Sequence, residues 1–228
     1  MTGTLASIVL PVHDQADHLG GVVEDYVAAL DRLPLAYELV LVPNACRDET
    51  PAVARALAER HAGVRVVESD LGGWGRAVRL GLSAAHGSLL CYTNSARTAP
   101  EELTLALLYA LAHPDVVVKA NRKIRERWMR RLGSLLYNLE CRALFDLACW
   151  DVNGTPKVFP RTMTGLLALS RDDDLIDAEF AAICRREGYP MLEVPIFSSR
   201  RHGGKSTTNL RSASRMYLGA YRLWRERR

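Results

Sequence analysis

The sequence lacks long apolar runs and paired cysteines. No stretch of 18 or more of its 228 residues is apolar, so we expect no helix that spans a membrane. Residues 1–12 have no basic segment and are interrupted at Pro11, which argues against a signal peptide. The cysteines form no Cys-x-x-Cys pair, which argues against a zinc site or a disulfide framework and favours a reducing cytoplasm. The five cysteines are Cys46, Cys91, Cys141, Cys149 and Cys184.

The composition is that of a soluble globular protein. Hydrophobic residues make up 48% of the chain and charged residues 25%, with a mean hydropathy of -0.06, so disorder as the dominant state is excluded. No internal repeat or low-complexity linker divides the sequence. We therefore expect a single domain over residues 1–228 with one sizeable core.

Charge is unevenly distributed along the chain. Residues 1–118 carry a net charge of −6, whereas residues 119–228 carry +10. The last 29 residues hold 9 basic side chains against one acidic side chain, Glu226. This asymmetry predicts that the second half meets an anionic partner: substrate phosphates, an anionic membrane surface or nucleic acid. A solvated basic face is the alternative.

Short apolar runs alternate with longer amphipathic stretches in the first half. The alternation predicts βαβ units and an α/β fold whose parallel sheet is covered on both faces. We expect strands at residues 7–12, 37–42, 64–68, 88–93 and 115–120. We expect helices at residues 17–31, 48–60, 75–86 and 100–112, with Asp48 as the N-cap of the second.

The pattern changes after residue 123. We expect helices at residues 125–145, 174–187 and 210–228, a strand at 192–197 and a polar loop at 198–209. The last helix combines arginines with aromatic side chains, which suits the interface of an anionic membrane. Docking of this helix on the core is the alternative. Nucleic acid is disfavoured because no nucleic-acid motif is present.

Polar residues follow each predicted strand of the first half. In parallel sheets the ligand lies beyond the carboxyl ends of the strands, so these residues predict a nucleotide or sugar crevice. Polar loops without a site are the alternative. The residues are His13 and Asp14, Asn44, Ser69 and Asp70, Asn94 and Ser95, and Asn121 and Arg122.

Six motifs in order carry a family resemblance. They cover residues 8–19, 41–50, 73–81, 87–103, 151–159 and 201–206. With them the chain resembles family-2 glycosyltransferases of the GT-A fold, nearest in layout to dolichyl-phosphate mannosyltransferases and bacterial polyprenyl-phosphate relatives. The resemblance implies a Rossmann-like three-layer α/β/α fold and an inverting transfer from a nucleotide-diphosphate sugar. Residues 1–122 would bind the donor, and residues 123–228, with the C-terminal basic amphipathic helix, the acceptor.

The sequence departs from this family at the metal site. The family's Asp-x-Asp triplet aligns with Asn94, Ser95 and Ala96, and an Asp pair near the base pocket aligns with Pro43 and Asn44. The resemblance implies Mg²⁺ or Mn²⁺, but these ions prefer anionic oxygen ligands. We therefore predict no metal ligands at the triplet.

Three explanations for the missing carboxylates stay open. Cationic side chains, Arg97 with Arg76 and Arg79, could stabilise the leaving diphosphate. A metal could instead be held by Asp14, Asp70 or Asp48, or catalysis could be lost. The predicted donor-binding residues are Pro11, His13, Asp14, Asn44, Asp48, Asp70, Gly73, Gly75, Arg76, Asn94, Ser95, Ala96 and Arg97.

The acceptor side depends on what the acceptor is. A polyprenyl phosphate is already anionic and needs cations; Arg130 and Ser134, four residues apart, share a helix face. A sugar hydroxyl would need a general base, for which Asp177 and Glu179 are candidates; stabilisation of a helix dipole is their alternative role. Arg201 is predicted to be both catalytic and acceptor-binding. The acceptor-binding residues predicted are Arg122, Arg130, Ser134, Lys157, Arg201, Lys205 and Ser206.

We therefore predict a cytoplasmic glycosyltransferase, peripheral at the inner face of the membrane, with a nucleotide-sugar donor and a lipid-phosphate acceptor. The alternative is a non-catalytic nucleotide-sugar-binding protein. A nucleotidyltransferase ranks last, because no glycine-rich loop ending in Lys or Arg follows the first strand.

Overall fold

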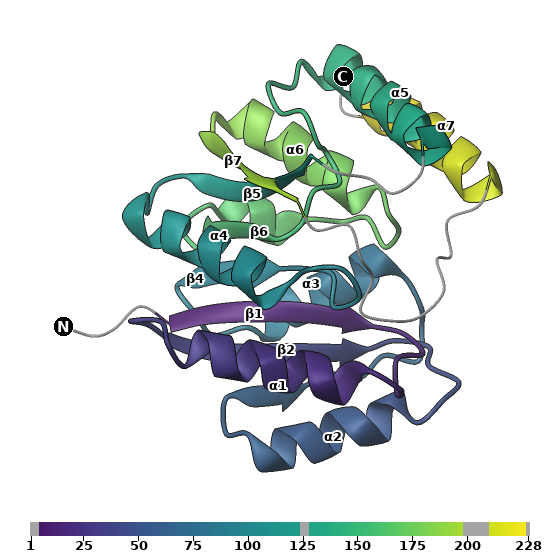
Figure 1. Cartoon of the computed structure of the whole chain (residues 1–228). Helices are drawn as coiled ribbons and strands as arrows, with labels where there is room; N and C mark the ends of the chain where they lie inside the picture. The colour runs from purple at the N-terminus through teal and green to yellow at the C-terminus, as the bar shows by residue number, and fades with distance from the viewer. Residues whose placement is uncertain (1–4, 124–127, 198–209, 227–228) are drawn as a thin grey trace.

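The computed structural model describes residues 5–123, 128–197 and 210–226, apart from the side chains of residues 128–132 and 210–214. Within these ranges the chain forms a sheet with the order β3-β2-β1-β4-β6-β5-β7 (Figure 1). Every pairing is parallel except those of β6 with β4 and β5, which confirms a mainly parallel sheet. The strands are β1 (Leu5–Val12), β2 (Ala36–Pro43), β3 (Val64–Val66), β4 (Leu89–Tyr92), β5 (Val117–Arg122), β6 (Lys157–Pro160) and β7 (Met191–Ile196).

The central strands β1 and β2 are buried along most of their length. Residues 6–12 of β1 and 38–43 of β2 are all buried, so these strands need cover on both faces. Their register pairs Val12 with Pro43. The two strands therefore end at the same level, and the loops that follow them meet at the carboxyl edge of the sheet.

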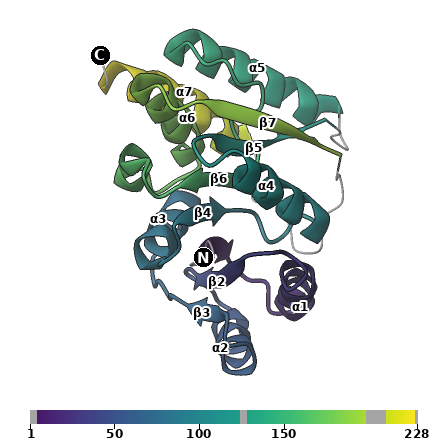
Figure 2. The same cartoon turned by 90° about the vertical axis from the view of Figure 1, so that its left-hand side faces the viewer.

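Two helical layers provide that cover (Figure 2). Ile8 and Leu10 of β1 pack with α1, α2 and α4 on one face, whereas Val9 packs with α3, α6 and a short 3-10 helix on the other. The sheet is thus the middle layer of three. The helices are α1 (Leu19–Leu30), α2 (Thr50–Arg60), α3 (Trp74–Ala84), α4 (Pro100–Ala112), α6 (Ile176–Glu187) and the 3-10 helix η1 (Thr164–Ala168).

A third apolar cluster lies at the end of the molecule where α5 (Trp128–Phe145) and α7 (Leu210–Glu226) pack together (Figure 1). The Tyr137 and Tyr217 rings meet edge to face, with centroids 5.7 Å apart. The Tyr217 hydroxyl also donates to the Gly133 carbonyl at 2.6 Å. None of the helices within the described ranges combines the length and the apolarity that crossing a bilayer requires.

A buried carboxylate, Glu38, ties the amino edge of the sheet together. It accepts hydrogen bonds from the Ser7 hydroxyl at 2.5 Å, the His86 backbone N–H at 2.6 Å and Arg65 Nη1 at 3.0 Å. Burial acts to raise the pKa of the Glu38 carboxyl, but these bonds outweigh it and lower the pKa to about 2.

Element boundaries differ from the sequence predictions where side chains bond locally. The Asp48 carboxylate accepts bonds from the Thr50 backbone N–H at 3.0 Å and from its hydroxyl at 2.5 Å, so α2 begins at Thr50 and Glu49 is its N-cap. The predicted strand 115–120 runs instead from Val117 to Arg122, because β5 follows β7 up to Ile196.

Candidate functional site

The carboxyl edge of the sheet holds a small pocket between the ends of β2 and β3. Its volume is about 150 Å³. An isolated parallel bridge joins Asn44 to Ser69 beside it and holds the two strand ends together. Asp70, one of the predicted donor residues, lines the pocket and is exposed. The lining residues are Pro43, Ala45, Cys46, Pro51, Glu68, Ser69 and Asp70.

His13, Asp14 and Cys46 come together at the ends of β1 and β2. One ligand atom from each lies within 4.8 Å of the others. His13 Nδ1 is 2.7 Å from the Asn44 carbonyl oxygen, and His13 Nε2 is 3.6 Å from Asp14 Oδ2. Burial raises the pKa of the Cys46 thiol. Sequence analysis missed Cys46, although its position three residues after β2 was the available signal.

Asn44 acts within the fold rather than at the surface. Its Nδ2 donates to the carbonyls of Val12 and Val42 at 2.9 and 3.2 Å, and its Oδ1 accepts from the Gly73 N–H at 3.2 Å. The amide therefore joins β1, β2 and the turn before α3. It stabilises the pocket wall instead of presenting both its donors to a base.

Residues 94–96, which replace the Asp-x-Asp triplet, form a turn after β4. Asn94 Oδ1 accepts from the Ala96 N–H at 3.0 Å, and the buried Ser95 hydroxyl bonds Gln15 Oε1 at 2.8 Å and the Pro11 carbonyl at 3.3 Å. Pro11 is itself buried. The turn offers no carboxylate, and Asn94 Oδ1 and the Ser95 hydroxyl bond within the fold, so it does not fit Mg²⁺ or Mn²⁺.

The glycines before and within α3 admit a close backbone approach. A Cβ at Gly73 would lie 2.3 Å from the Asp172 carbonyl oxygen, and a Cβ at Gly75 would lie 2.3 Å from that of Arg171. Gly73 also has a φ of 144°, which favours glycine. These predicted donor residues thus seat the loop at residues 171–173 against the start of α3.

Asp172 forms ion pairs with two of the arginines that are predicted to stabilise the leaving diphosphate in place of a metal. Arg76 Nη2 and Arg79 Nη1 each lie 2.5 Å from one of its carboxylate oxygens. All three side chains are one third to two fifths exposed. Arg97 is half-buried just after the turn at residues 94–96. The guanidinium groups of Arg76 and Arg79 are therefore accessible to solvent and already paired with Asp172.

Asp48 holds the loop between β1 and α1. Besides Thr50, it accepts from the Ala16 N–H at 3.1 Å. Burial acts to raise the pKa of its carboxyl, but the hydrogen bonds from Thr50 and Ala16 lower it on balance. Asp48 is exposed yet already bonded, which makes it a structural neighbour of the edge.

Arg122 and Asp151 form a bidentate pair in the second half. Arg122 Nε and Nη2 lie 2.7 and 2.8 Å from the two carboxylate oxygens, and the Arg122 N–H donates at 3.0 Å. Gly154, in the same motif, lets this segment approach β5, since a Cβ there would meet the Ala120 carbonyl at 2.0 Å. The motif at residues 151–157 therefore fastens β5 to β6.

Lys157 and Asp177 form a fully buried ion pair. Asp177 also accepts from the Tyr92 hydroxyl at 2.9 Å. Burial lowers the pKa of the Lys157 ammonium, and its Nζ lies over the rings of Tyr92 and Phe180 at 5.2 and 5.6 Å. Lys157 is therefore enclosed rather than presented to a phosphate.

Glu179, the second candidate base, is also buried. Its carboxylate accepts from the Ser170 hydroxyl at 2.6 Å and from the backbone N–H groups of Ser170 and Arg171 at 2.9 Å. The sequence predicts Asp177 and Glu179 as candidate general bases. Instead both carboxylates bond within the fold and stabilise α6 and the loop before it.

The remaining acceptor predictions fall partly outside the described residues. Arg201, Lys205 and Ser206 lie in the segment 198–209, which the structure does not describe. Arg130 and Ser134 lie on α5; Ser134 is half-buried, and the side chain of Arg130 is outside the described set. These roles stay predictions.

The family is defined by a direct match. Residues 7–163 match the family model described as Glycosyl transferase family 2. The chain belongs to this glycosyltransferase family, and its three-layer architecture is the GT-A fold.

Its relatives include transferases whose names contain undecaprenyl phosphate. The undecaprenyl-phosphate 4-deoxy-4-formamido-L-arabinose transferase of Sodalis glossinidius is 25% identical over 207 residues, covering 90% of this chain and 63% of the relative. The enzyme of the same name from Edwardsiella ictaluri is 30% identical over 136 residues, covering 58% and 42%. The chain thus spans less than two thirds of the length of these relatives.

Solved structures support the same fold. Glucosyl-3-phosphoglycerate synthase from Mycobacterium tuberculosis, in complex with Mn²⁺, UDP and phosphoglyceric acid, superposes with a TM-score of 0.72 at 18% identity, covering 96% of this chain and 76% of that one. Mannosyl-3-phosphoglycerate synthase from Rubrobacter xylanophilus gives 0.66 at 23% identity, covering 99% and 74%.

Proposed function

We propose that this domain transfers a sugar from a nucleotide-diphosphate sugar to a polyprenyl phosphate. The observation that carries the proposal is the pocket at the carboxyl ends of β2 and β3 in a family-2 domain, where sheets of this kind bind nucleotides. The names of the relatives support a lipid-phosphate acceptor.

The transfer needs no general base on this acceptor. A phosphate oxygen of the acceptor attacks the anomeric carbon, a new C–O bond forms, and the bond to the nucleoside diphosphate breaks. The enclosure of Asp177 and Glu179 agrees with this route, since neither carboxylate is available to take a proton.

The leaving diphosphate gains negative charge that the protein must stabilise. Arg76 and Arg79 are the candidates, because both lie beside the glycine turn and their partner Asp172 is half-exposed. A bound diphosphate would displace Asp172 as the ion-pair partner of the two guanidinium groups. No added Mg²⁺ or Mn²⁺ would be required at residues 94–96.

The test begins with calorimetric binding of a panel of UDP- and GDP-sugars, followed by transfer to undecaprenyl phosphate. We expect transfer without added Mg²⁺ or Mn²⁺. The double variant Arg76→Ala/Arg79→Ala should weaken donor binding by about tenfold or more. Arg185→Ala is the matched control, because Arg185 pairs with Asp146 on an exposed surface and should leave binding unchanged.

The same experiment separates the two candidate functions. The internal bonding of residues 94–96 favours a non-catalytic binding protein as the second candidate. Donor binding without transfer would support that candidate. Absence of binding by every sugar nucleotide would contradict both functions.

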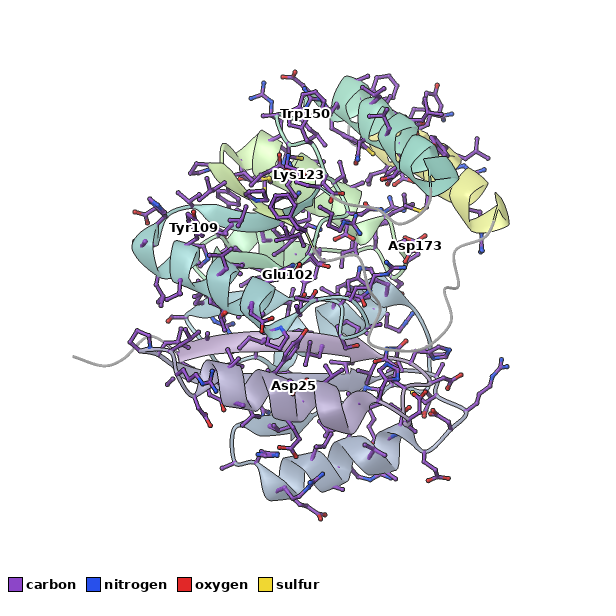
Figure 3. All side chains as sticks on the ribbon, viewed as in Figure 1. Asp25, Glu102, Tyr109, Lys123, Trp150 and Asp173 are labelled. Carbon is purple, nitrogen blue, oxygen red and sulfur yellow. The ribbon has the colours of Figure 1, made fainter. Side chains whose placement is uncertain are left out.

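We also propose that the end of the molecule formed by α5 and α7 contacts an anionic membrane on its cytoplasmic face. Apolar side chains are exposed on both helices, and the nearby Trp150 side chain is exposed as well (Figure 3). The Arg142 guanidinium lies 3.9 Å from the centre of the Trp150 ring. Exposed apolar groups beside arginines suit a membrane interface. The apolar residues are Leu135, Leu136, Leu139, Trp150, Leu218 and Tyr221.

Vesicle co-sedimentation tests this surface. Leu136→Asp/Leu139→Asp should reduce binding to anionic vesicles by about tenfold. Leu105→Asp/Leu108→Asp on α4 is the matched control, with the same spacing and comparable exposure. Equal binding by both variants and the unmodified chain would exclude this surface.

A further inference from the structure

Three chemically different metal ligands gather at the carboxyl edge of β1 and β2. His13 supplies an imidazole, Asp14 a carboxylate and Cys46 a thiol, and one ligand atom from each lies within 4.8 Å of the others. His13 and Asp14 are exposed and Cys46 is half-buried, so the group opens to solvent. The register of Val12 with Pro43 fixes this meeting point.

The hydrogen bond of His13 determines which ring nitrogen faces the group. The Asn44 carbonyl can only accept, so His13 Nδ1, 2.7 Å away, is the donor. In the neutral ring, Nε2 then carries a lone pair. That atom lies 3.6 Å from Asp14 Oδ2, which is also an acceptor. Two facing acceptors repel each other unless a proton on Nε2 or a metal cation lies between them.

The outer contacts resemble those that hold metal ligands in place. Metal-binding histidines commonly donate their second ring N–H to a backbone carbonyl, as His13 does to Asn44. Asp14 Oδ1 accepts from the Arg47 backbone N–H at 2.7 Å. This bond orients the carboxylate and leaves Oδ2 directed toward the histidine.

The ligand set distinguishes between metals. Nitrogen, oxygen and sulfur together suit Zn²⁺, whereas Mg²⁺ and Mn²⁺ prefer oxygen ligands alone. Tetrahedral Zn²⁺ places its ligand atoms about 3.3–3.7 Å apart. His13 Nε2 and Asp14 Oδ2, 3.6 Å apart, already lie within that range.

We propose that His13, Asp14 and Cys46 bind a Zn²⁺ ion at the donor edge, with a fourth position open to water or to an anion. This site does not depend on whether the domain transfers sugar. It places a divalent cation beside the pocket that Cys46 lines, at a position separate from residues 94–96.

The test uses the full chain after removal of metals with a chelator. Calorimetric titration with Zn²⁺ should give one bound ion, and Zn²⁺ should raise the melting temperature. Addition of Co²⁺ as a spectroscopic probe should produce the charge-transfer absorption of a thiolate-bound ion. Cys46→Ser should abolish that absorption and weaken Zn²⁺ binding by about a hundredfold or more.

Two further variants make the result specific. His13→Ala should weaken Zn²⁺ binding to a similar degree, whereas His113→Ala, an exposed histidine after α4, should change nothing. Circular dichroism of each variant should match that of the unmodified chain, as a control that the variant is folded. Retention of the Co²⁺ absorption in Cys46→Ser, or equal Zn²⁺ binding by the His13→Ala and His113→Ala variants, would overturn the proposal. Failure of the unmodified chain to bind Zn²⁺ would assign the cluster to a simple His13–Asp14 ion pair.

Discussion

The two halves of the carboxyl edge use their charged groups in opposite ways. In the second half, Lys119, Arg122 and Lys157 each lie against a carboxylate inside the fold. In the first half, His13 and Asp14 are exposed beside a pocket. Within the described ranges, these three cations of the more basic half are thus paired inside the fold, whereas the two ionisable groups of the first half are exposed.

This difference shows what a net charge can hide. The second half carries +10 over residues 119–228, a value that already subtracts Glu193, Asp151 and Asp177. These carboxylates pair with Lys119, Arg122 and Lys157, so the excess positive charge resides on other side chains. A buried ion pair adds little net stability, because the desolvation of its two charges offsets their attraction. Removal of one partner is costly, because the other charge stays buried without compensation. Substitutions at the carboxyl edge should accordingly differ in kind: loss of stability at the buried pairs of Lys119, Arg122 and Lys157, and loss of binding at the exposed His13 and Asp14.

The largest effect is expected at the buried pair. Lys157→Met should lower the free energy of unfolding by about 3–5 kcal/mol, because Asp177 is left charged without its partner. Urea denaturation at neutral pH measures the loss. Lys157→Met/Asp177→Leu should recover part of it, and Arg185→Met, at an exposed pair, should cost less than about 1 kcal/mol. Equal losses for Lys157→Met and Arg185→Met would contradict the assignment of this cost to burial of the pair.

A smaller effect, with a defined pH dependence, is expected at Glu38. Its pKa of about 2 in the fold lies below the ordinary value of 4.5. The unfolded chain therefore binds the proton first as pH falls. The stabilisation should be complete above about pH 5 and be lost progressively as pH falls through 4.5 toward 2.

Glu38→Gln provides the measurement. It should cost about 2–3 kcal/mol at neutral pH, and its stability should fall less steeply in acid than that of the unmodified chain. Denaturation in urea at several pH values tests this. Parallel pH profiles for the two chains would contradict the assigned role of Glu38.

Asp172→Ala should lower stability slightly and raise the affinity for a nucleoside diphosphate. Loss of its half-exposed pairs with Arg76 and Arg79 should cost about 1 kcal/mol or less. Affinity for a nucleoside diphosphate should rise severalfold, because the two guanidinium groups no longer have a competing carboxylate. Asp146→Ala, at the exposed pair with Arg185, should leave affinity unchanged; a fall in affinity for Asp172→Ala would count against the exchange.

The smallest effect is expected at His13. In the metal-free chain, His13→Ala removes one hydrogen bond at the surface and should cost less than about 1 kcal/mol. Thermal melting in the presence of chelator checks this. A loss of stability as large as that of Lys157→Met would mean that His13 also contributes substantially to the stability of the fold.

Local patterns were sufficient to predict most of the elements. The apolar runs at residues 7–12 and 37–42 predict buried strands between helices, and the structure confirms both, with the layers around them. The short strand β6 was harder to predict, because its four residues gain their place only by pairing with β4 and β5.

The candidate site shows the same limit more clearly. Lys157 and Asp177 are twenty residues apart, and no local signal pairs them, so Lys157 reads in sequence as an available cation. Cys46 looked isolated among scattered cysteines. Its closeness to His13 and Asp14 follows only from the parallel register of β1 with β2, which composition and spacing do not encode.

The position of β6 also determines how the chain can be divided. β6 belongs to the second half but is hydrogen-bonded to β4 of the first. A fragment ending at residue 122 would leave one edge of β4 without its neighbour, although all four residues of that strand are buried in the whole chain. Such an apolar open edge favours pairing between molecules, so residues 1–122 should aggregate when expressed alone. We therefore expect the two halves, although distinct in charge, to fold together.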